Sequence, residues 1–213
     1  MEKTISDIAA DCAAAKEASR ELAFAPTRVK NRALEAIVSG LREGCDGILE
    51  ANAADLADER AQGLSDSLTD RLSLDRGRVE AMADGVEAVV SLDDPVGEVL
   101  EERRLDTGIE LSKVRVPLGV VAVVYEARPN VTIDCAVLTI KSGNAILLRG
   151  SSYAERTNGA LADIVREGLA EAGLPADSVV LSTGGGREQL AELATQDGVV
   201  DLLIPRGGEG LKN

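Results

Sequence analysis

Residues 116–152 read VPLGVVAVVYEARPNVTIDCAVLTIKSGNAILLRGSS, and this stretch is the strongest indication of the fold class. The segment GVVAVVY (119–125) is a continuous aliphatic run, which is typical of a strand buried on both faces. A helix over 131–142 follows, and Gly143 is a good residue to end it. AILLR (145–149) is then a second strand. This strand–helix–strand unit predicts a parallel sheet built with right-handed crossovers.

The same alternation continues towards the end of the sequence. We expect a helix over 153–173, a third strand over 178–182, a short helix over 187–195 and a fourth strand over 199–204. The last residues, RGGEGLKN (206–213), read as the first turn of a further crossover helix. The fold class is therefore α/β, with a Rossmann-like parallel sheet that we expect to be truncated at residue 213.

Residues 1–97 read as a helical segment, in which one apolar stripe continues from Leu34 to Ile48 at three- and four-residue steps. Residues 98–116 alternate about the turn residues Asp106, Thr107 and Gly108, which predicts a β-hairpin. Its charged exterior is equally compatible with plain surface and with strand pairing between subunits.

We therefore expect residues 1–213 to form one incomplete cofactor-binding domain with three parts. These are a helical segment (1–97), the hairpin (98–116) and Rossmann-like βα units (117–213).

Composition narrows the function classes. The chain has 213 residues, 45% hydrophobic and 1% aromatic, with a formal net charge of −14. A chain this acidic, without a basic stripe, is not expected to bind nucleic acid or an anionic membrane. Histidine is absent, which removes imidazole catalysis and most metal sites, so no metal is expected.

No signal-like or membrane-spanning segment is recognisable, and we expect a protein of the reducing cytoplasm. Three cysteines, Cys12, Cys45 and Cys135, lie far apart in the sequence. Two stand on apolar helical stripes and Cys135 has no basic neighbour in sequence. We interpret all three as buried and inert.

Ligands of open parallel sheets bind beyond the carboxyl ends of the strands, where the loops EARPN, RGSS, TGGG and PRGGEG fall. Arg149, Ser151 and Ser152 follow a strand directly and include no acid, which favours NADP over NAD. The plainer interpretation is an exposed arginine and a serine that caps the next helix.

Two more loops carry candidate ligand groups. Arg206, Gly207 and Gly208 place backbone N–H groups at a helix start, a weak phosphate-binding signal by itself. In YEARPNVT (125–132), Arg128 could hold a carboxylate or phosphate, and Asn130 could donate to an oxyanion. A simple helix cap at Asn130 is about equally plausible from the sequence.

Taken together, several segments closely resemble the γ-glutamyl phosphate reductase family of the aldehyde dehydrogenase superfamily. They include residues 114–152 and the motifs REGLAEAGLP and DLLIPRGGEGL, together with AKEASRELA and RVEAMADGVEAVVSLDDPVGEVL in the helical segment. The resemblance implies NADPH-dependent reduction of L-glutamyl 5-phosphate to glutamate 5-semialdehyde and phosphate, in cytoplasmic proline biosynthesis. It also implies a catalytic domain with a cysteine nucleophile and a hairpin used in homo-oligomerisation.

By position, the resemblance makes Asn130 the oxyanion-stabilising residue. It places Arg149 and Ser152 near the adenosine ribose of NADP(H), and it directs the turn of Arg206, Gly207 and Gly208 towards the pyrophosphate. A role for Arg128 in binding the substrate is our own inference.

Nothing in the sequence matches the family's nucleophilic cysteine, so the catalytic domain is expected to be absent and this chain alone inactive. Two alternatives stay open. One is a non-catalytic nucleotide-binding or dimerisation module of the same fold. The other is a fragment of an ordinary NAD(P)-dependent aldehyde dehydrogenase, against which the anion-suited Arg128 argues.

Overall fold

The computed structural model describes residues 7–184 and 186–207, and its α/β fold with a parallel sheet confirms the predicted class. Ahead of the sheet, the described residues form the helices α1 (Ile8–Leu22), α2 (Thr27–Glu43), α3 (Cys45–Leu56), α4 (Asp66–Leu72) and α5 (Arg76–Ser91). A hairpin of β1 (Val99–Arg104) and β2 (Glu110–Val114) follows. The βα units are β3 (Val120–Tyr125), α6 (Asn130–Lys141), β4 (Ala145–Arg149), α7 (Glu155–Glu171), β5 (Val179–Leu181), α8 (Arg187–Ala194) and β6 (Leu202–Arg206).

The four strands β3 to β6 are parallel, in the spatial order β5-β4-β3-β6. The chain therefore builds outward from β3 through β4 to β5 and then returns to the other side of β3. The register pairs Val124 of β3 with Arg149 of β4, and Tyr125 of β3 with Arg206 of β6. The order reverses between β3 and β6, and such a switch point is where open α/β sheets bind ligands.

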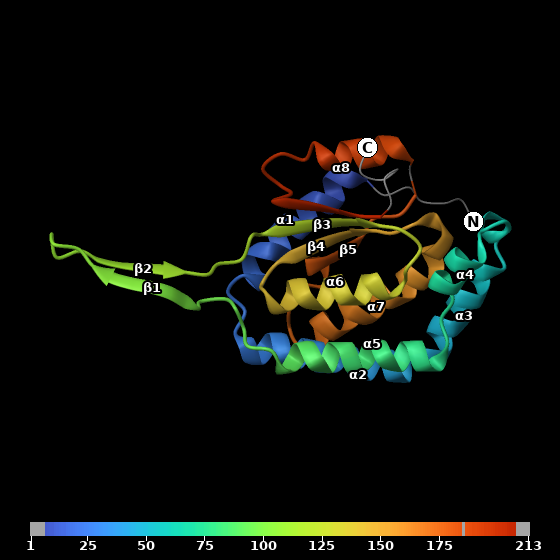
Figure 1. Ribbon diagram of the computed structural model, residues 1–213, viewed down its shortest axis with the longest axis horizontal. Helices are drawn as coiled ribbons and strands as arrows, with labels where there is room; N and C mark the ends of the chain where they lie inside the picture. Colours follow the sequence, from blue (N-terminus) through green and yellow to red (C-terminus); the bar gives the residue numbers. More distant parts are fainter. Residues whose placement is uncertain (1–6, 185, 208–213) are drawn as a thin grey trace.

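Helices cover both faces of this sheet, with α6 and α7 on one side and α1 and α8 on the other (Figure 1). Side chains of β3 alternate between the two cores: Val121 and Val123 join the larger one, and Ala122 and Val124 join the smaller one under α1 and α8. Helices α2 and α5 form a further layer outside α6 and α7. Burial of aliphatic side chains on both faces explains why these strands read as continuous apolar runs.

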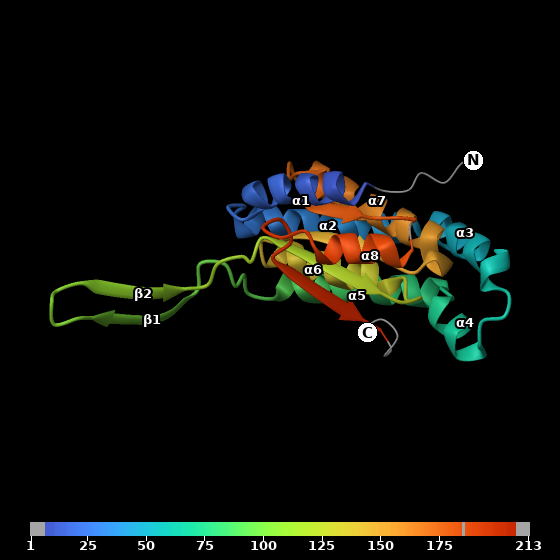
Figure 2. The ribbon, with the colours of Figure 1, turned by 90° about the horizontal axis from the view of Figure 1, so that it is seen from above.

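The hairpin of β1 and β2 projects away from the body, from the end of the sheet opposite α3 and α4 (Figures 1 and 2). All residues of both strands are exposed, which includes Val99, Leu111 and Val114. At its root, Asp94 accepts a hydrogen bond from the Val96 amide and forms a buried salt bridge with Lys30 at 2.6 Å. The hairpin is therefore anchored firmly to α2 but makes no core of its own.

One predicted boundary is wrong, and the predicted apolar stripe is shared by two helices. The stripe that reaches Ile48 is divided between α2 and α3, because Gly44 interrupts the helix where a Cβ would lie 2.8 Å from the Gly40 carbonyl oxygen. The fourth strand begins at Leu202 rather than residue 199, since the Val199 and Val200 amides donate to the Gln196 carbonyl in a turn.

No helix in the described part of the chain is both long and apolar enough to span a membrane.

Candidate functional site

A cleft of about 640 Å³ lies beyond the carboxyl ends of β3, β4 and β5. Residues from each strand end line it, and Leu68 of α4 closes one side. We call it the cofactor cleft, and its lining includes Tyr125, Glu126, Arg149, Gly150, Ser151, Ser152, Tyr153, Glu155, Asn158, Ser182, Thr183 and Gly184. The structure thus brings three of the predicted cofactor residues, Arg149, Ser151 and Ser152, to one cavity.

A buried hydrogen-bond chain forms one wall of the cofactor cleft. The Thr132 hydroxyl donates to Asn158 Oδ1 at 3.0 Å, and the Tyr125 hydroxyl lies 2.7 Å from Thr132 Oγ1. Gly150 lies directly against this chain, since a Cβ there would come within 2.2 Å of Asn158 Nδ2 and 3.0 Å of Tyr125. Burial raises the pKa of the Tyr125 hydroxyl above its ordinary value, so that it stays protonated. The wall is therefore rigid and leaves no space for a side chain at position 150.

Arg149 is half-buried, which differs from the plainer sequence interpretation of an exposed arginine. Its guanidinium donates to the Gly184 carbonyl at 2.8 Å, to Gln189 Oε1 at 3.0 Å and to the Gly186 carbonyl at 3.3 Å. Burial lowers the pKa of this group from its ordinary value. Arg149 thus ties the glycine-rich loop after β5 to the end of β4 while its side chain lines the cofactor cleft.

Ser151 and Ser152 differ in environment. The Ser151 hydroxyl accepts a hydrogen bond from the Tyr153 amide at 3.3 Å, so the predicted capping role fits Ser151. Ser152 is exposed in the cleft lining. Sequence reasoning missed Glu155, which lines the same cleft and forms a salt bridge with Arg60 at 3.0 Å. Only its position on the first turn of α7 could have signalled it.

Ser182 is a second residue that sequence reasoning missed. It is 2% exposed and lines the cofactor cleft after β5, and its hydroxyl is one of the few buried polar side-chain atoms in the described residues without a hydrogen-bond partner. A buried hydroxyl usually has a partner. Its orientation is therefore compatible with a hydrogen bond to a ligand of the cleft.

Asn130 lies in a neighbouring pocket of about 470 Å³, which Arg128, Asp134, Met82 and Arg71 also line. Its amide Nδ2 donates to Asp134 Oδ2 at 3.0 Å, and no side-chain capping bond forms at the start of α6. The helix-cap alternative for Asn130 is therefore wrong. Burial raises the pKa of Asp134, and the nearby Arg206 cation opposes that rise.

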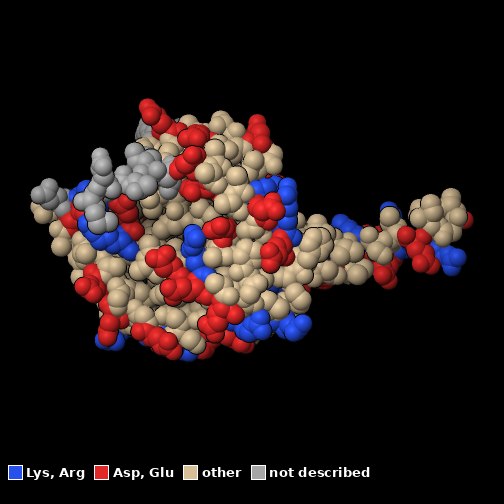
Figure 3. All heavy atoms as spheres, turned by 180° about the vertical axis from the view of Figure 1, so that it is seen from behind, with Lys and Arg blue, Asp and Glu red and all other residues tan. Residues whose placement is uncertain are grey.

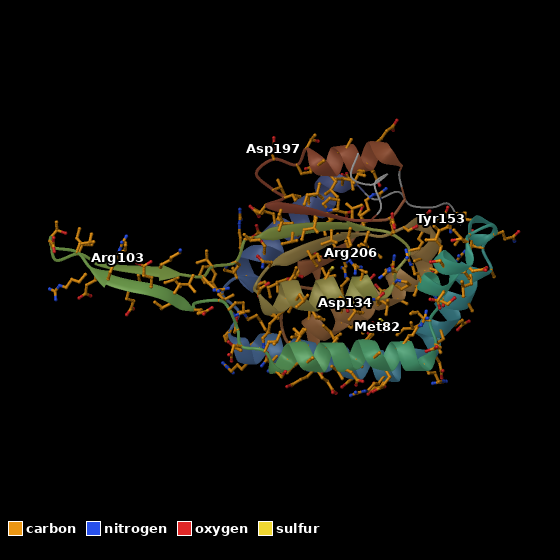
Figure 4. All side chains as sticks on the ribbon, viewed as in Figure 1. Met82, Arg103, Asp134, Tyr153, Asp197 and Arg206 are labelled. Atoms are coloured by element: carbon orange, nitrogen blue, oxygen red, sulfur yellow. The ribbon has the colours of Figure 1, made fainter. Side chains whose placement is uncertain are left out.

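A third pocket, of about 340 Å³, is lined by Leu68, Arg71, Glu126, Ala127, Arg128, Arg206 and Gly207. It lies at the switch point between the ends of β3 and β6, and Figure 4 shows Arg206 beside Asp134 in this region. We call this pocket the three-arginine crevice. Gly208, which was also predicted to contact the cofactor, lies outside the described residues.

The cysteines agree in most respects with the inert interpretation. Cys12 and Cys45 are buried, whereas Cys135 is only half-buried, so its predicted burial is wrong in degree. Burial raises the pKa of Cys12 to about 11 and also raises that of Cys135, although Arg206 partly opposes the second shift. Within residues 7–184 and 186–207, no cluster of three His, Cys, Asp or Glu residues could hold a metal ion.

This arrangement of strand-end clefts has a counterpart among known proteins. Residues 1–204 match the Aldehyde dehydrogenase family. The chain belongs to this family.

Three of the similar proteins share the name gamma-glutamyl phosphate reductase. The chain is 47% identical over 197 residues to the gamma-glutamyl phosphate reductase of Thermobifida fusca. The aligned region covers 92% of this chain and 47% of that protein. The crystal structure of the reductase of that name from Thermotoga maritima aligns with a TM-score of 0.93 and 39% identity, over 97% of this chain and 50% of the other. The Saccharomyces cerevisiae reductase aligns with a TM-score of 0.87 and 35% identity, over 98% and 53% respectively. The chain spans about half the length of these relatives.

Proposed function

We propose that this chain is the cofactor-binding portion of an NADPH-dependent acyl-phosphate reductase that acts on L-glutamyl 5-phosphate in cytoplasmic proline biosynthesis. The reaction consumes the acyl phosphate, NADPH and a proton, and it gives glutamate 5-semialdehyde, NADP⁺ and phosphate. The observation that carries the proposal is the sequence of three pockets at the strand ends, in which the three-arginine crevice shares lining residues with both the cofactor cleft and the Asn130 pocket. The chain that forms them is 47% identical to a protein named gamma-glutamyl phosphate reductase.

The residues of the cofactor cleft fit a dinucleotide. Gly150 lines the cleft and lets the backbone pack closely on Asn158, and the buried Ser182 hydroxyl can bind a polar group of the ligand. Arg149, Ser151 and Ser152 would lie at the adenosine ribose and favour a 2′-phosphate. The nearby Glu155 carboxylate is paired with Arg60, which weakens its repulsion of that phosphate. When bound, the nicotinamide supplies the hydride.

The turn at the end of β6 would face the pyrophosphate with the backbone of Arg206 and Gly207. Asn130 would stabilise the oxyanion at the reacting carbonyl, since its amide is held at the pocket wall by Asp134. Arg128 lines the same pocket and would bind an anionic group of the substrate. Asn130 and Arg128 would position the acyl group, and neither is a nucleophile.

Burial raises the pKa of both Cys12 and Cys135, and Cys45 is buried, so we expect none of these three thiols to act as the nucleophile. We therefore expect the 213-residue chain to bind NADPH without turning over substrate. The reverse reaction, from glutamate 5-semialdehyde, NADP⁺ and phosphate, is the direct assay. Turnover by the chain alone would contradict this part of the proposal.

Cofactor choice is tested by titrating the chain with NADPH and with NADH, followed by nucleotide fluorescence. We expect tighter binding of NADPH, and a loss of about tenfold or more on Arg149→Ala, since a charge-assisted hydrogen bond contributes roughly 1.5–3 kcal/mol. Arg103→Ala, in the exposed hairpin, is the matched control. Tighter binding of NADH, or equal NADPH affinity in both variants, would refute the 2′-phosphate assignment.

We also propose that the hairpin joins copies of the chain. Its exposed apolar residues, which include Leu100, Ile109 and Leu111, support this role because neither strand packs on the body. Replacing Ile109 and Leu111 by Lys is expected to lower the mass measured by light scattering without changing thermal stability. An unchanged mass would leave the hairpin as plain surface.

A further inference from the structure

Three arginines from separate parts of the chain meet in the three-arginine crevice. Arg71 comes from the last turn of α4, Arg128 from the loop between β3 and α6, and Arg206 from the end of β6. Arg71 belongs to the helical segment and is more than fifty positions from Arg128 in the sequence, so only the tertiary fold places it here.

Among the described residues, these three guanidinium groups form none of the salt bridges that many arginines of this chain form. Arg60 and Arg156 form salt bridges with nearby acids. Within the described residues, no salt bridge or side-chain hydrogen bond involves Arg71, Arg128 or Arg206, and all three are exposed. Acidic side chains are nevertheless spread over the body of the molecule, as the face in Figure 3 shows. A group of unpaired cations in so acidic a chain indicates an anionic ligand.

The electrostatic influence of the crevice reaches the groups beside it. Arg206 favours the charged forms of Asp134 and Cys135, and thereby opposes the effect of burial on the pKa of each. The charged groups that face Arg206 from α6 and from the β3–α6 loop are Asp134, Glu126 and Arg128. A bound dianion would reduce the mutual repulsion of the arginines, and guanidinium groups bind phosphate oxygens in pairs.

The crevice also lies between the other two pockets. It shares Leu68, Glu126 and Ala127 with the cofactor cleft, and it shares Arg71 and Arg128 with the Asn130 pocket. An anion held here would therefore lie between the cofactor and the reacting carbonyl. Its place at the reversal of strand order, between β3 and β6, is a usual ligand position in α/β sheets.

We propose that Arg71, Arg128 and Arg206 form a phosphate site, which holds the phosphoryl group of the acyl phosphate and the inorganic phosphate that is released. Arg71 is the new member, a specificity-determining residue that α4 contributes from outside the sheet. The inference rests on the proposed function for the identity of the substrate, and the phosphate site itself is tested without cofactor.

The test is calorimetric titration of the chain with inorganic phosphate at constant ionic strength. We expect Arg71→Gln to weaken binding about tenfold or more, and Arg71→Lys to keep part of the affinity as a point charge. Arg103→Gln, far from the crevice on the hairpin (Figure 4), should bind as the parent chain does. Thermal melting of each variant verifies that it is folded.

Absence of phosphate binding by the parent chain would overturn the proposal. Equal weakening by Arg71→Gln and Arg103→Gln would also overturn it, because that result indicates diffuse charge attraction. Repeating the titration with saturating NADPH separates the two sources of phosphate. Persistent binding supports a substrate site, whereas complete competition assigns the crevice to a cofactor phosphate and refutes the substrate role. Failure of the proposed function would show separately, as weak NADPH binding beside intact phosphate binding.

Discussion

The cofactor cleft and the three-arginine crevice adjoin each other but are built in opposite ways. In the cleft, Arg149 is bound by carbonyl oxygens of the loop after β5, and Gly150 packs against the buried Asn158. In the crevice, Arg71 and Arg206 are exposed, with no salt bridge among the described residues. The polar groups of the cleft wall therefore have partners within the folded protein. The arginines of the crevice form no salt bridge within the described residues.

The difference separates two kinds of site residue. A group that the fold uses for its own hydrogen bonds should destabilise the protein when it is removed. A group that only a ligand uses should leave stability nearly unchanged and alter binding. Substitutions in each region therefore test this difference.

The largest effect is expected at Gly150 in the cleft wall. Gly150→Val should lower the free energy of unfolding by about 1–3 kcal/mol, because the added atoms overlap Asn158 and Tyr125. Urea denaturation measures the change. Gly159→Ala is the control, since a Cβ at that position of α7 has no neighbour within 4 Å. Equal stability of the valine variant and the parent would show that the wall is not rigid.

Thr132 should follow in size. Thr132→Val removes the hydroxyl between Tyr125 and Asn158 but keeps the shape, and leaves two buried polar groups without this partner. The expected loss is about 1–3 kcal/mol by the same denaturation measurement. Thr132→Ser, which keeps the hydroxyl, should lose less. The reverse ranking of the two variants would refute the hydrogen-bond explanation.

A smaller loss is expected for Arg149→Met, about 1 kcal/mol, because the hydrogen bonds lost are offset by removing a half-buried charge. Hydrogen exchange should increase in the loop of residues 182–186, which Arg149 holds at Gly184 and Gly186. Unchanged exchange there would show that the loop is fixed by other contacts.

The smallest change in stability is expected in the crevice, where Arg206→Gln should stay within about 0.5 kcal/mol of the parent. Its signature is electrostatic: loss of the cation should raise the pKa of Asp134 further, measured by carboxyl NMR titration. A raised pKa means that the folded state binds the proton more tightly, so this contribution to stability is present in acid and lost as pH rises through the folded pKa. The variant should move that loss to higher pH. A fall in the pKa would contradict the placement of Arg206.

Local pattern was enough to predict the βα units and the hairpin. The side chains of β3 and β4 are buried on both faces of the sheet, so each strand is a continuous aliphatic run that can be recognised in the sequence. The boundaries depended on contacts the pattern does not contain. Gly44 divides a stripe that is periodic on both sides of it, and Pro205 continues β6 because this strand pairs with β3 alone among the described strands.

The candidate site was predictable in so far as its residues follow strands directly. Arg128, Arg149 and Arg206 were found in this way, because the carboxyl ends of parallel strands meet at one edge. Ser182 and Glu155 were missed, since a hydroxyl without a partner and a paired carboxylate are properties of packing. Arg71 lies on a short amphipathic helix that by itself indicates only surface.

The fold class, the edge of the sheet where ligands would bind and most of the charged groups at that edge could all be predicted from the sequence alone. These follow from hydrophobic periodicity and turn residues, which act over a few neighbouring positions. The tertiary structure was needed to show that Arg149 donates to carbonyl oxygens and that the crevice arginines form no salt bridge within the described residues. That outcome depends on groups brought together from distant positions, and the strength of charge pairing is set by distance and burial.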